Sequence, residues 1–147
     1  MRKTPILVAL ALTALLAAGC SSTSTDPAAS APATVAQVSA PAAPERVDAP
    51  YFAAAVATPG VVVLDVRTPE EYATGYISGA VNIDAEGADF AAQVGTLDPE
   101  ATYAVYCRSG NRSAGAVAAM SAAGIQHVYE LESGIVGWQE AGYPLEG

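Results

Sequence analysis

One cysteine of the chain stands in a setting that favours anion and sulfur chemistry. It opens the stretch Cys107-Arg-Ser-Gly-Asn-Arg-Ser113, which follows an apolar segment at 102–106. Gly110 permits a positive φ, and Asn111 tolerates one better than most residues do. Successive backbone N–H groups can therefore turn inward and surround an anion at this point.

Positive charge also gathers around this cysteine. Arg108 and Arg112 carry full charges, and a helix that begins in the loop directs the positive end of its dipole there. Such surroundings favour the thiolate of Cys107, which is the nucleophilic form. The alternative is an inert structural cysteine, which fits poorly with two arginines and a Gly-Asn turn. We expect Cys107 to be catalytic and the rest of the loop to bind substrate: Arg108, Ser109, Gly110, Asn111, Arg112 and Ser113.

Alternating strand and helix patterns position this loop. Apolar, often β-branched runs predict strands at 61–66, 80–83, 102–106 and 127–131. Helices are predicted around them at 50–57 with Asp48 as the cap, after a second cap at Thr68, and at 88–94, 112–123 and 135–141. The alternation predicts an α/β fold, a parallel sheet with helices on both faces. Reactive groups gather at the carboxyl ends of such strands, which is where Cys107 falls.

Three further stretches have the order and spacing of one family's motifs: Leu64-Asp-Val-Arg-Thr-Pro-Glu-Glu-Tyr72, Gly75-Tyr-Ile-Ser-Gly-Ala-Val-Asn-Ile83, and Leu131-Glu-Ser-Gly134 followed by Trp138 and Gly142-Tyr-Pro144. Together with the cysteine loop they resemble the single-domain rhodanese-like sulfurtransferases, over about 50–147. Tyr76 stands where histidine is common in that family, and Ser133 stands where glycine is common. Both departures lie outside the cysteine loop.

The resemblance implies a rhodanese-like parallel sheet of five strands and a reaction that needs no metal or organic cofactor. The Cys107 thiolate would take the sulfane sulfur of a small anionic donor such as thiosulfate and become a persulfide. A thiol or cyanide acceptor would then remove the sulfur. Two alternatives stay open. One is a non-catalytic rhodanese module that only binds partners, and the other is a phosphatase of the related fold. Phosphatases use C-x5-R, whereas Arg112 gives C-x4-R here and Ser113 is the sixth residue after the cysteine.

Two charged residues near the end of the strand at 61–66 are candidates to support the site. Asp65 and Arg67 are expected chiefly as an ion pair that braces the loops, with Glu71 as a further partner of Arg67. His127 is the only histidine, and no motif brings it to Cys107, so we expect a structural role for it.

Charge and cysteine content exclude several classes of partner. The formal net charge is −9, and from Pro50 onward twelve acidic residues accompany three arginines and no lysine. No basic patch is available, so we expect no binding to nucleic acid or to an anionic membrane face. Two cysteines give neither a disulfide framework nor a C-x-x-C zinc motif.

The first residues have the pattern of an export signal. Arg2 and Lys3 precede an uncharged run at 6–18, which is shorter than the roughly 20 residues needed to span a bilayer. The run ends at Leu16-Ala-Ala-Gly-Cys20, which resembles a bacterial lipoprotein signal. Residues 1–19 would be removed and Cys20 lipidated, which predicts an exported, membrane-anchored protein in the periplasm or on the outer cell surface. An ordinary cleavable signal is the alternative, and it would leave Cys20 as a free thiol.

The segment that follows has a different composition. Residues 20–49 consist mainly of Ala, Ser, Thr and Pro and show no apolar periodicity, so a disordered tether is predicted there. The composition changes near Pro50, and one domain is expected at 50–147.

Overall fold

The computed structural model describes residues 37–147. The predicted signal at 1–19, Cys20 and most of the predicted tether lie outside these described residues. No helix within residues 37–147 is both long and apolar enough to cross a membrane.

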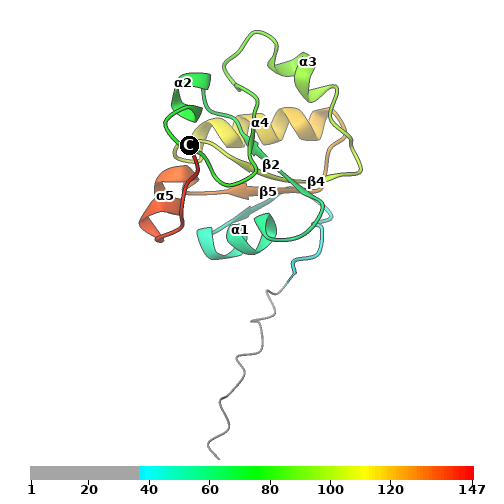
Figure 1. The fold of residues 1–147 in the computed structure, drawn as a ribbon. Coiled ribbons are helices and arrows are strands. Elements are labelled where there is room, and N and C mark those ends of the chain that lie inside the picture. Colours follow the sequence, from blue (N-terminus) through cyan, green and yellow to red (C-terminus); the bar gives the residue numbers. More distant parts are fainter. Residues whose placement is uncertain (1–36) are drawn as a thin grey trace, which may run out of the picture. The chain divides into compact units, whose positions relative to one another are not determined.

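One five-stranded sheet organises the described part of the chain (Figure 1). Its strands are β1 (Glu45–Val47), β2 (Val61–Asp65), β3 (Val81–Asn82), β4 (Thr102–Tyr106) and β5 (Val128–Leu131). They run in the order β1-β5-β4-β2-β3, and every neighbouring pair is parallel. The central position of β4 places the residue after it, Cys107, in the middle of the sheet's carboxyl edge. The predicted parallel α/β fold is confirmed.

Helices cover both faces of the sheet, as expected for parallel strands that are buried on both sides. They are α1 (Ala49–Val56), α2 (Pro69–Tyr72), α3 (Phe90–Val94), α4 (Asn111–Ala122) and α5 (Gly134–Glu140). Figure 1 shows α1 and α5 on one side of the sheet, with α3 and α4 on the other. Each side has its own apolar cluster: Phe52, Tyr106 and Trp138 belong to the first, while Val105, Cys107 and Met120 belong to the second.

Caps fix the starts of two helices as the sequence predicts. The Asp48 carboxylate accepts the N–H of Tyr51 at 2.9 Å and begins α1. At α2, Thr68 and Glu71 form a capping box in which each side chain accepts the backbone N–H of the other. Such caps satisfy N–H groups that have no partner within the helix.

The strand β1 corrects the predicted boundary of the domain. Its backbone pairs with β5 in the register Arg46↔Glu130, so the ordered domain begins before Pro50 and the predicted tether was extended too far. Val47 is the only apolar and the only buried residue of this three-residue strand, so the sequence shows no hydrophobic pattern that would predict it. The segment before β1 also contacts the domain. The Tyr129 hydroxyl donates to the Ser39 carbonyl, and His127 Nδ1 lies 2.7 Å from the Pro41 oxygen.

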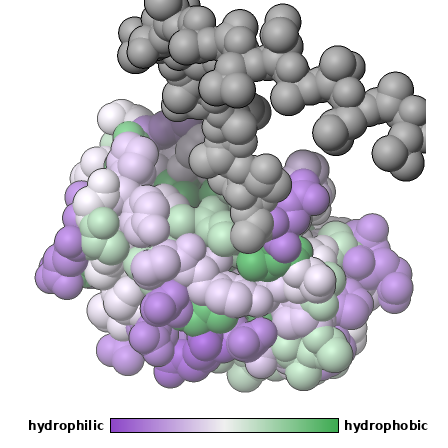
Figure 2. Space-filling model, turned by 90° about the horizontal axis from the view of Figure 1, so that it is seen from below, coloured by the Kyte–Doolittle hydropathy of each residue, from purple (hydrophilic) through white to green (hydrophobic). Residues whose placement is uncertain are grey.

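Large apolar side chains are exposed at only a few places in residues 37–147. They are Tyr51, Val81 and Val136, which come from α1, β3 and α5. Figure 2, which views the molecule from below, shows small apolar patches separated by polar residues on the visible surface. The buried polar or charged side chains of this part of the chain are Asp65, Arg67, Ser113 and Glu130.

Candidate active site

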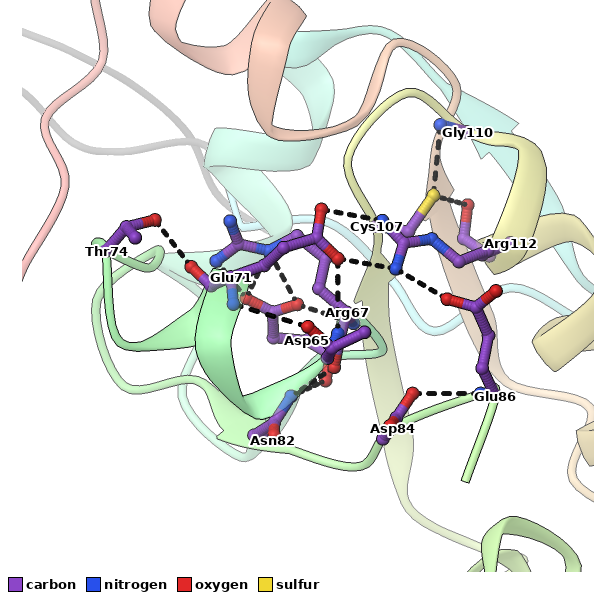
Figure 3. Close-up of polar contacts among 12 residues, drawn as sticks. Asp65, Arg67, Glu71, Thr74, Asn82, Asp84, Glu86, Cys107, Gly110 and Arg112 are labelled. Carbon is purple, nitrogen blue, oxygen red and sulfur yellow. Dashed lines mark hydrogen bonds and ion pairs between the residues drawn. The ribbon is translucent and has the colours of Figure 1, made fainter. Parts of the chain in front are cut away.

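The loop between β4 and α4 turns around the sulfur of Cys107. The Cys107 side chain is buried, with the residue 1 % exposed. The backbone N–H of Gly110 donates to Sγ at 3.2 Å (Figure 3). Sγ also lies 3.5 Å from the Ser113 hydroxyl oxygen. The sulfur therefore lies inside a turn of hydrogen-bonding groups, although the sequence context of a buried strand end alone would suit an apolar side chain.

Gly110 is required for this turn on two grounds. Its φ is +87°, in the left-handed region, and it immediately precedes α4. A Cβ atom there would also lie 2.0 Å from the backbone oxygen of Glu132. Asn111 does not adopt a positive φ but is the first residue of α4. The conformational freedom predicted for the Gly-Asn turn thus resides in the glycine alone.

The start of α5 holds the loop from the outside. The N–H of Ile135 donates to the Cys107 carbonyl at 2.9 Å, and that of Val136 donates to the Arg108 carbonyl at 3.2 Å. Gly134, with φ +61°, lies so close that a Cβ atom would be 2.4 Å from the Arg108 carbonyl carbon. The closing L-x-x-G motif therefore serves as the rear wall of the cysteine loop.

The balance of burial and hydrogen bonding lowers the pKa of the Cys107 thiol. Burial, the largest single influence, raises the pKa because it disfavours the charged form. The Ser113 hydroxyl and the backbone N–H groups of Ser113, Ser109 and Gly110 together outweigh burial and bring the pKa below its ordinary value. The stabilising groups are thus a hydroxyl and loop amides, whereas the sequence pattern also assigned part of this effect to the arginines.

Arg112 is held by two carboxylates. Its Nη1 and Nη2 donate to the two Glu71 oxygens at 2.5 and 2.8 Å, and Nη1 also reaches Glu86 at 3.0 Å (Figure 3). The hydrogen bond from Arg112 lowers the pKa of Glu71 despite partial burial. The expected pairing of Glu71 with Arg67 is wrong, because the Arg67 guanidinium is already occupied by other acceptors. Arg112 connects the start of α4 to α2 and to the chain after β3.

Asp65 and Arg67 form the buried ion pair that the sequence predicted. Arg67 Nη2 lies 2.6 Å from Asp65 Oδ2, and Arg67 Nε lies 2.9 Å from both carboxylate oxygens. Nη2 also donates to the Gly75 carbonyl at 2.7 Å, and the Asn82 side chain donates to the backbone oxygens of both residues. Asp65 pairs in register with Tyr106, one residue before Cys107. The pair therefore braces the strand ends beside the cysteine (Figure 3).

A hollow of about 350 Å³ opens beside the loop. It is lined by Arg67, Glu71, Thr74, Arg108, Ile135, Val136 and Gln139. Arg108 is exposed, and among the arginines of residues 37–147 it is the one without a carboxylate partner. Cys107 does not line this hollow itself but is adjacent in the chain to Arg108. Unneutralised positive charge is thus offered to an anion at the wall of the hollow.

A buried acid that the sequence patterns did not single out lies behind the cysteine. Glu130 is 3 % exposed in β5, where every residue is buried. Its Oε1 accepts a hydrogen bond from the Ser113 hydroxyl at 2.9 Å, and its Oε2 lies 3.4 Å from Arg46 Nε. The available signal was a single acid inside the otherwise apolar run Val-Tyr-Glu-Leu, which a buried strand tolerates only when the acid is paired.

Metal binding has no ligand set in the described part of the chain. Between residues 37 and 147, no three His, Cys, Asp or Glu side chains come together as candidate metal ligands. No residue of this region is therefore assigned to a metal.

Sequence comparison places residues 48–141 in the family described as Rhodanese-like domain. The thiosulfate sulfurtransferase GlpE of Pseudomonas entomophila (strain L48) is 37 % identical over 95 residues, covering 64 % of this chain and 84 % of that protein. The GlpE protein of Pseudomonas putida (strain F1) is 38 % identical over 88 residues, covering 59 % of this chain and 76 % of that protein.

Solved structures give the same result for the fold. A rhodanese-related protein from Thermoplasma volcanium superposes with a TM-score of 0.62 at 33 % identity, covering 69 % of this chain and 97 % of that one. A protein from Lactobacillus plantarum gives 0.60 at 34 % identity, covering 69 % and 87 %. The five-stranded parallel sheet is thus shared with proteins related in sequence.

Proposed function

We propose, from the premise that this chain belongs to the rhodanese-like family, that it is a sulfurtransferase which carries sulfur as a persulfide on Cys107. The relatives that it matches include thiosulfate sulfurtransferases, so a sulfurtransferase-type family is established. The observation that carries the proposal is the Cys107 sulfur, held by the Gly110 N–H with its pKa lowered by the loop. A thiolate in such a turn is a nucleophile whose product, a persulfide anion, can be held by the same donors.

The reaction with thiosulfate is a displacement at sulfur. The Cys107 thiolate attacks the outer sulfur and forms a new S–S bond, while the S–S bond of thiosulfate breaks and sulfite leaves with its electron pair. Cyanide or a thiolate acceptor then attacks the outer sulfur of the persulfide, which releases thiocyanate or an acceptor persulfide and restores the Cys107 thiolate. Charge is conserved in each step, and no oxidant is required.

Arg108 is proposed to attract the anionic donor. It is exposed, lines the hollow and has no carboxylate partner among residues 37–147. Arg112 was predicted to bind substrate as well, and that role stays a prediction. Glu71 and Glu86 already neutralise the charge of Arg112, so it offers less attraction to an anion than Arg108 does. We propose that the hydrogen-bond donors and the shape of the loop bind the substrate, with Ser109, Gly110, Asn111 and Ser113 as the residues involved.

The two alternatives are less well supported by the site. A cysteine phosphatase needs its arginine at the sixth position after the cysteine, where Ser113 points to Sγ and to Glu130. The Arg112 guanidinium, one position earlier, is bonded to α2 instead. A binding module would have no need of a thiol whose pKa is lowered by the loop.

The test uses the full chain with thiosulfate and cyanide. We expect thiocyanate to form, and the peptide that contains Cys107 to gain the mass of one sulfur atom when cyanide is omitted. Cys107→Ser should show neither result while remaining folded by circular dichroism. Thiocyanate formation by that variant, or phosphatase activity without any sulfur gain in the wild type, would overturn the proposal.

We further propose that Cys20 is lipidated and that the protein is exported and anchored in a membrane facing the periplasm or the outer surface. The support is the sequence pattern at 1–20 alone. Expressed in a bacterial host, the mature chain should begin at a modified Cys20 and partition into detergent, and Cys20→Ala should not. A mature N-terminus at another residue would contradict the anchor.

A further inference from the structure

A chain of polar contacts runs from the catalytic sulfur to the edge of the sheet. Cys107 Sγ lies 3.5 Å from Ser113 Oγ, Ser113 Oγ lies 2.9 Å from Glu130 Oε1, and Glu130 Oε2 lies 3.4 Å from Arg46 Nε. The four residues come from the end of β4, α4, β5 and β1. The proposed function uses the first two and gives no role to the buried acid.

The Ser113 hydroxyl has one proton and two anions that compete for it. A serine hydroxyl donates a single hydrogen bond. Ser113 is fully buried, so solvent cannot supply a second donor to either side. The contact with Glu130 is the shorter one, and a hydroxyl–carboxylate bond is charge-assisted and strong. While Glu130 is charged, the hydroxyl proton is therefore held mainly by the carboxylate, and the sulfur receives only part of the Ser113 hydrogen bond that lowers its pKa.

We propose that Glu130 is a positioning residue for Cys107: it draws the hydroxyl proton of Ser113 toward itself and so weakens the hydrogen bond from Ser113 to the sulfur. The Cys107 thiolate is then stabilised by the loop N–H groups without the full help of the hydroxyl. Glu130 thus sets how acidic, and how nucleophilic, the thiol is without contacting the substrate.

A weaker hydrogen bond from Ser113 to the sulfur benefits the sulfur transfer proposed above, and this benefit rests on that proposed function. A thiolate loses intrinsic nucleophilicity as its pKa falls, with a Brønsted coefficient of about 0.4–0.5 in exchange at sulfur. The loop amides already stabilise the thiolate, and a stronger hydrogen bond from Ser113 would leave a more abundant but slower nucleophile. Holding the Ser113 proton away keeps Cys107 reactive toward a sulfane sulfur.

Two arginines carry positive charge that influences this chain of contacts. Arg46, from β1, pairs with Glu130 and is largely exposed, with 53 % of its side chain accessible. Arg112, from α4, exerts a weak electrostatic influence on Cys107, and Glu71 and Glu86 hold it in place. Loss of the Arg46 charge should strengthen the field of Glu130 at Cys107. Arg46 and Glu130 variants are thus expected to act in opposite directions.

The decisive experiment is the pH dependence of Cys107 alkylation by iodoacetamide in the full chain, measured on the Cys107 peptide by mass spectrometry. Glu130→Gln keeps the length and hydrogen bonding of the side chain but removes its charge. We expect its alkylation midpoint to move to lower pH. Its rate at high pH should fall by about threefold for every tenfold gain in thiol acidity. Arg46→Gln should move the midpoint to higher pH, and Glu140→Gln, an exposed acid on α5, should leave it unchanged.

Ser113→Ala tests the path. In that background, the further change Glu130→Gln should move the midpoint clearly less than it does when Ser113 is present. An unchanged or raised midpoint in Glu130→Gln, or an equal change without Ser113, would overturn the proposal. If Glu130→Gln does not fold by circular dichroism, Arg46→Gln at the exposed edge decides, and an unchanged midpoint there overturns it.

The alkylation assay needs no sulfur donor or acceptor. A chain that failed to transfer sulfur would still reveal whether Glu130 sets the acidity of Cys107, so failure of the two proposals can be told apart.

Discussion

The two sides of the Cys107 loop handle charge differently. On the β2 side, Arg67 and Arg112 are each bound to carboxylates, and their charges are cancelled where they stand. On the α5 side, Arg108 is exposed at the hollow, and the sulfur itself is held by backbone N–H groups and a hydroxyl. In this acidic domain, ion pairs connect the elements around the loop, and backbone N–H groups stabilise the Cys107 thiolate. Arginines that look alike in the sequence therefore have separate roles.

The largest effect on stability should come from removing the buried ion pair beside the loop. Asp65→Asn leaves the Arg67 guanidinium buried without its counter-charge, which typically costs about 3–5 kcal/mol of folding stability. Chemical denaturation should show that loss. Arg112→Ala, in the more exposed pair with Glu71, should cost about 1 kcal/mol or less. Equal losses of stability in both variants would contradict the distinction between the buried Asp65–Arg67 pair and the more exposed Glu71–Arg112 pair.

The loop should be next in sensitivity. Gly110→Ala places a Cβ atom against the Glu132 carbonyl at a positive φ, so we expect a loss of about 1–3 kcal/mol in stability and of most thiocyanate formation. Gly115→Ala is the matched control, because it lies within α4 with nothing near its Cβ position. That change should stabilise the chain by about 0.5–1 kcal/mol. Full activity in Gly110→Ala would show that the turn is not needed.

The two loop arginines should differ in their effects on substrate and sulfur. Arg108→Ala should raise the KM for thiosulfate by about 2- to 5-fold, as expected for an exposed charge contact, and leave the Cys107 alkylation midpoint unchanged. Arg108→Lys keeps the charge and should retain most of the binding. An altered midpoint with unchanged KM in Arg108→Ala would reverse the assignment of roles.

The smallest effect should be on stability through the thiol. The folded pKa of Cys107 is lowered, so the thiolate contributes stability that is complete above the unfolded pKa of about 8.5. This contribution disappears as the pH falls through the folded pKa. In Cys20→Ala, which leaves one thiol, the alkylation midpoint should lie below the midpoint of the same chain unfolded in urea. Coincident midpoints would show that the loop does not acidify Cys107.

The sequence was sufficient for features that depend on local chemistry. β4 begins and ends as predicted, the caps at Asp48 and Thr68 form, and the Asp65–Arg67 pair is present, because each rests on short patterns. β1 was missed, since a three-residue edge strand is defined by pairing with β5, which lies more than eighty residues away.

Side-chain partners were the harder part of the site. Glu71 bonds Arg112 rather than Arg67, and Glu130 meets Ser113, because α2, α4 and β5 converge only after folding. No spacing rule in the sequence encodes these meetings. The motif located the cysteine loop, and the fold determined which charges were already paired.

Acceptance of sulfur by Cys107 within this loop can be measured directly. The measurement is the intact mass of the full chain after incubation with thiosulfate and removal of the excess, followed by peptide mapping. We expect one added sulfur atom on the Cys107 peptide, which is lost when cyanide is added and absent in Cys107→Ser. A wild-type chain whose Cys107 peptide gains no sulfur, or a gain found only at Cys20, would contradict the assignment of Cys107 as the sulfur carrier.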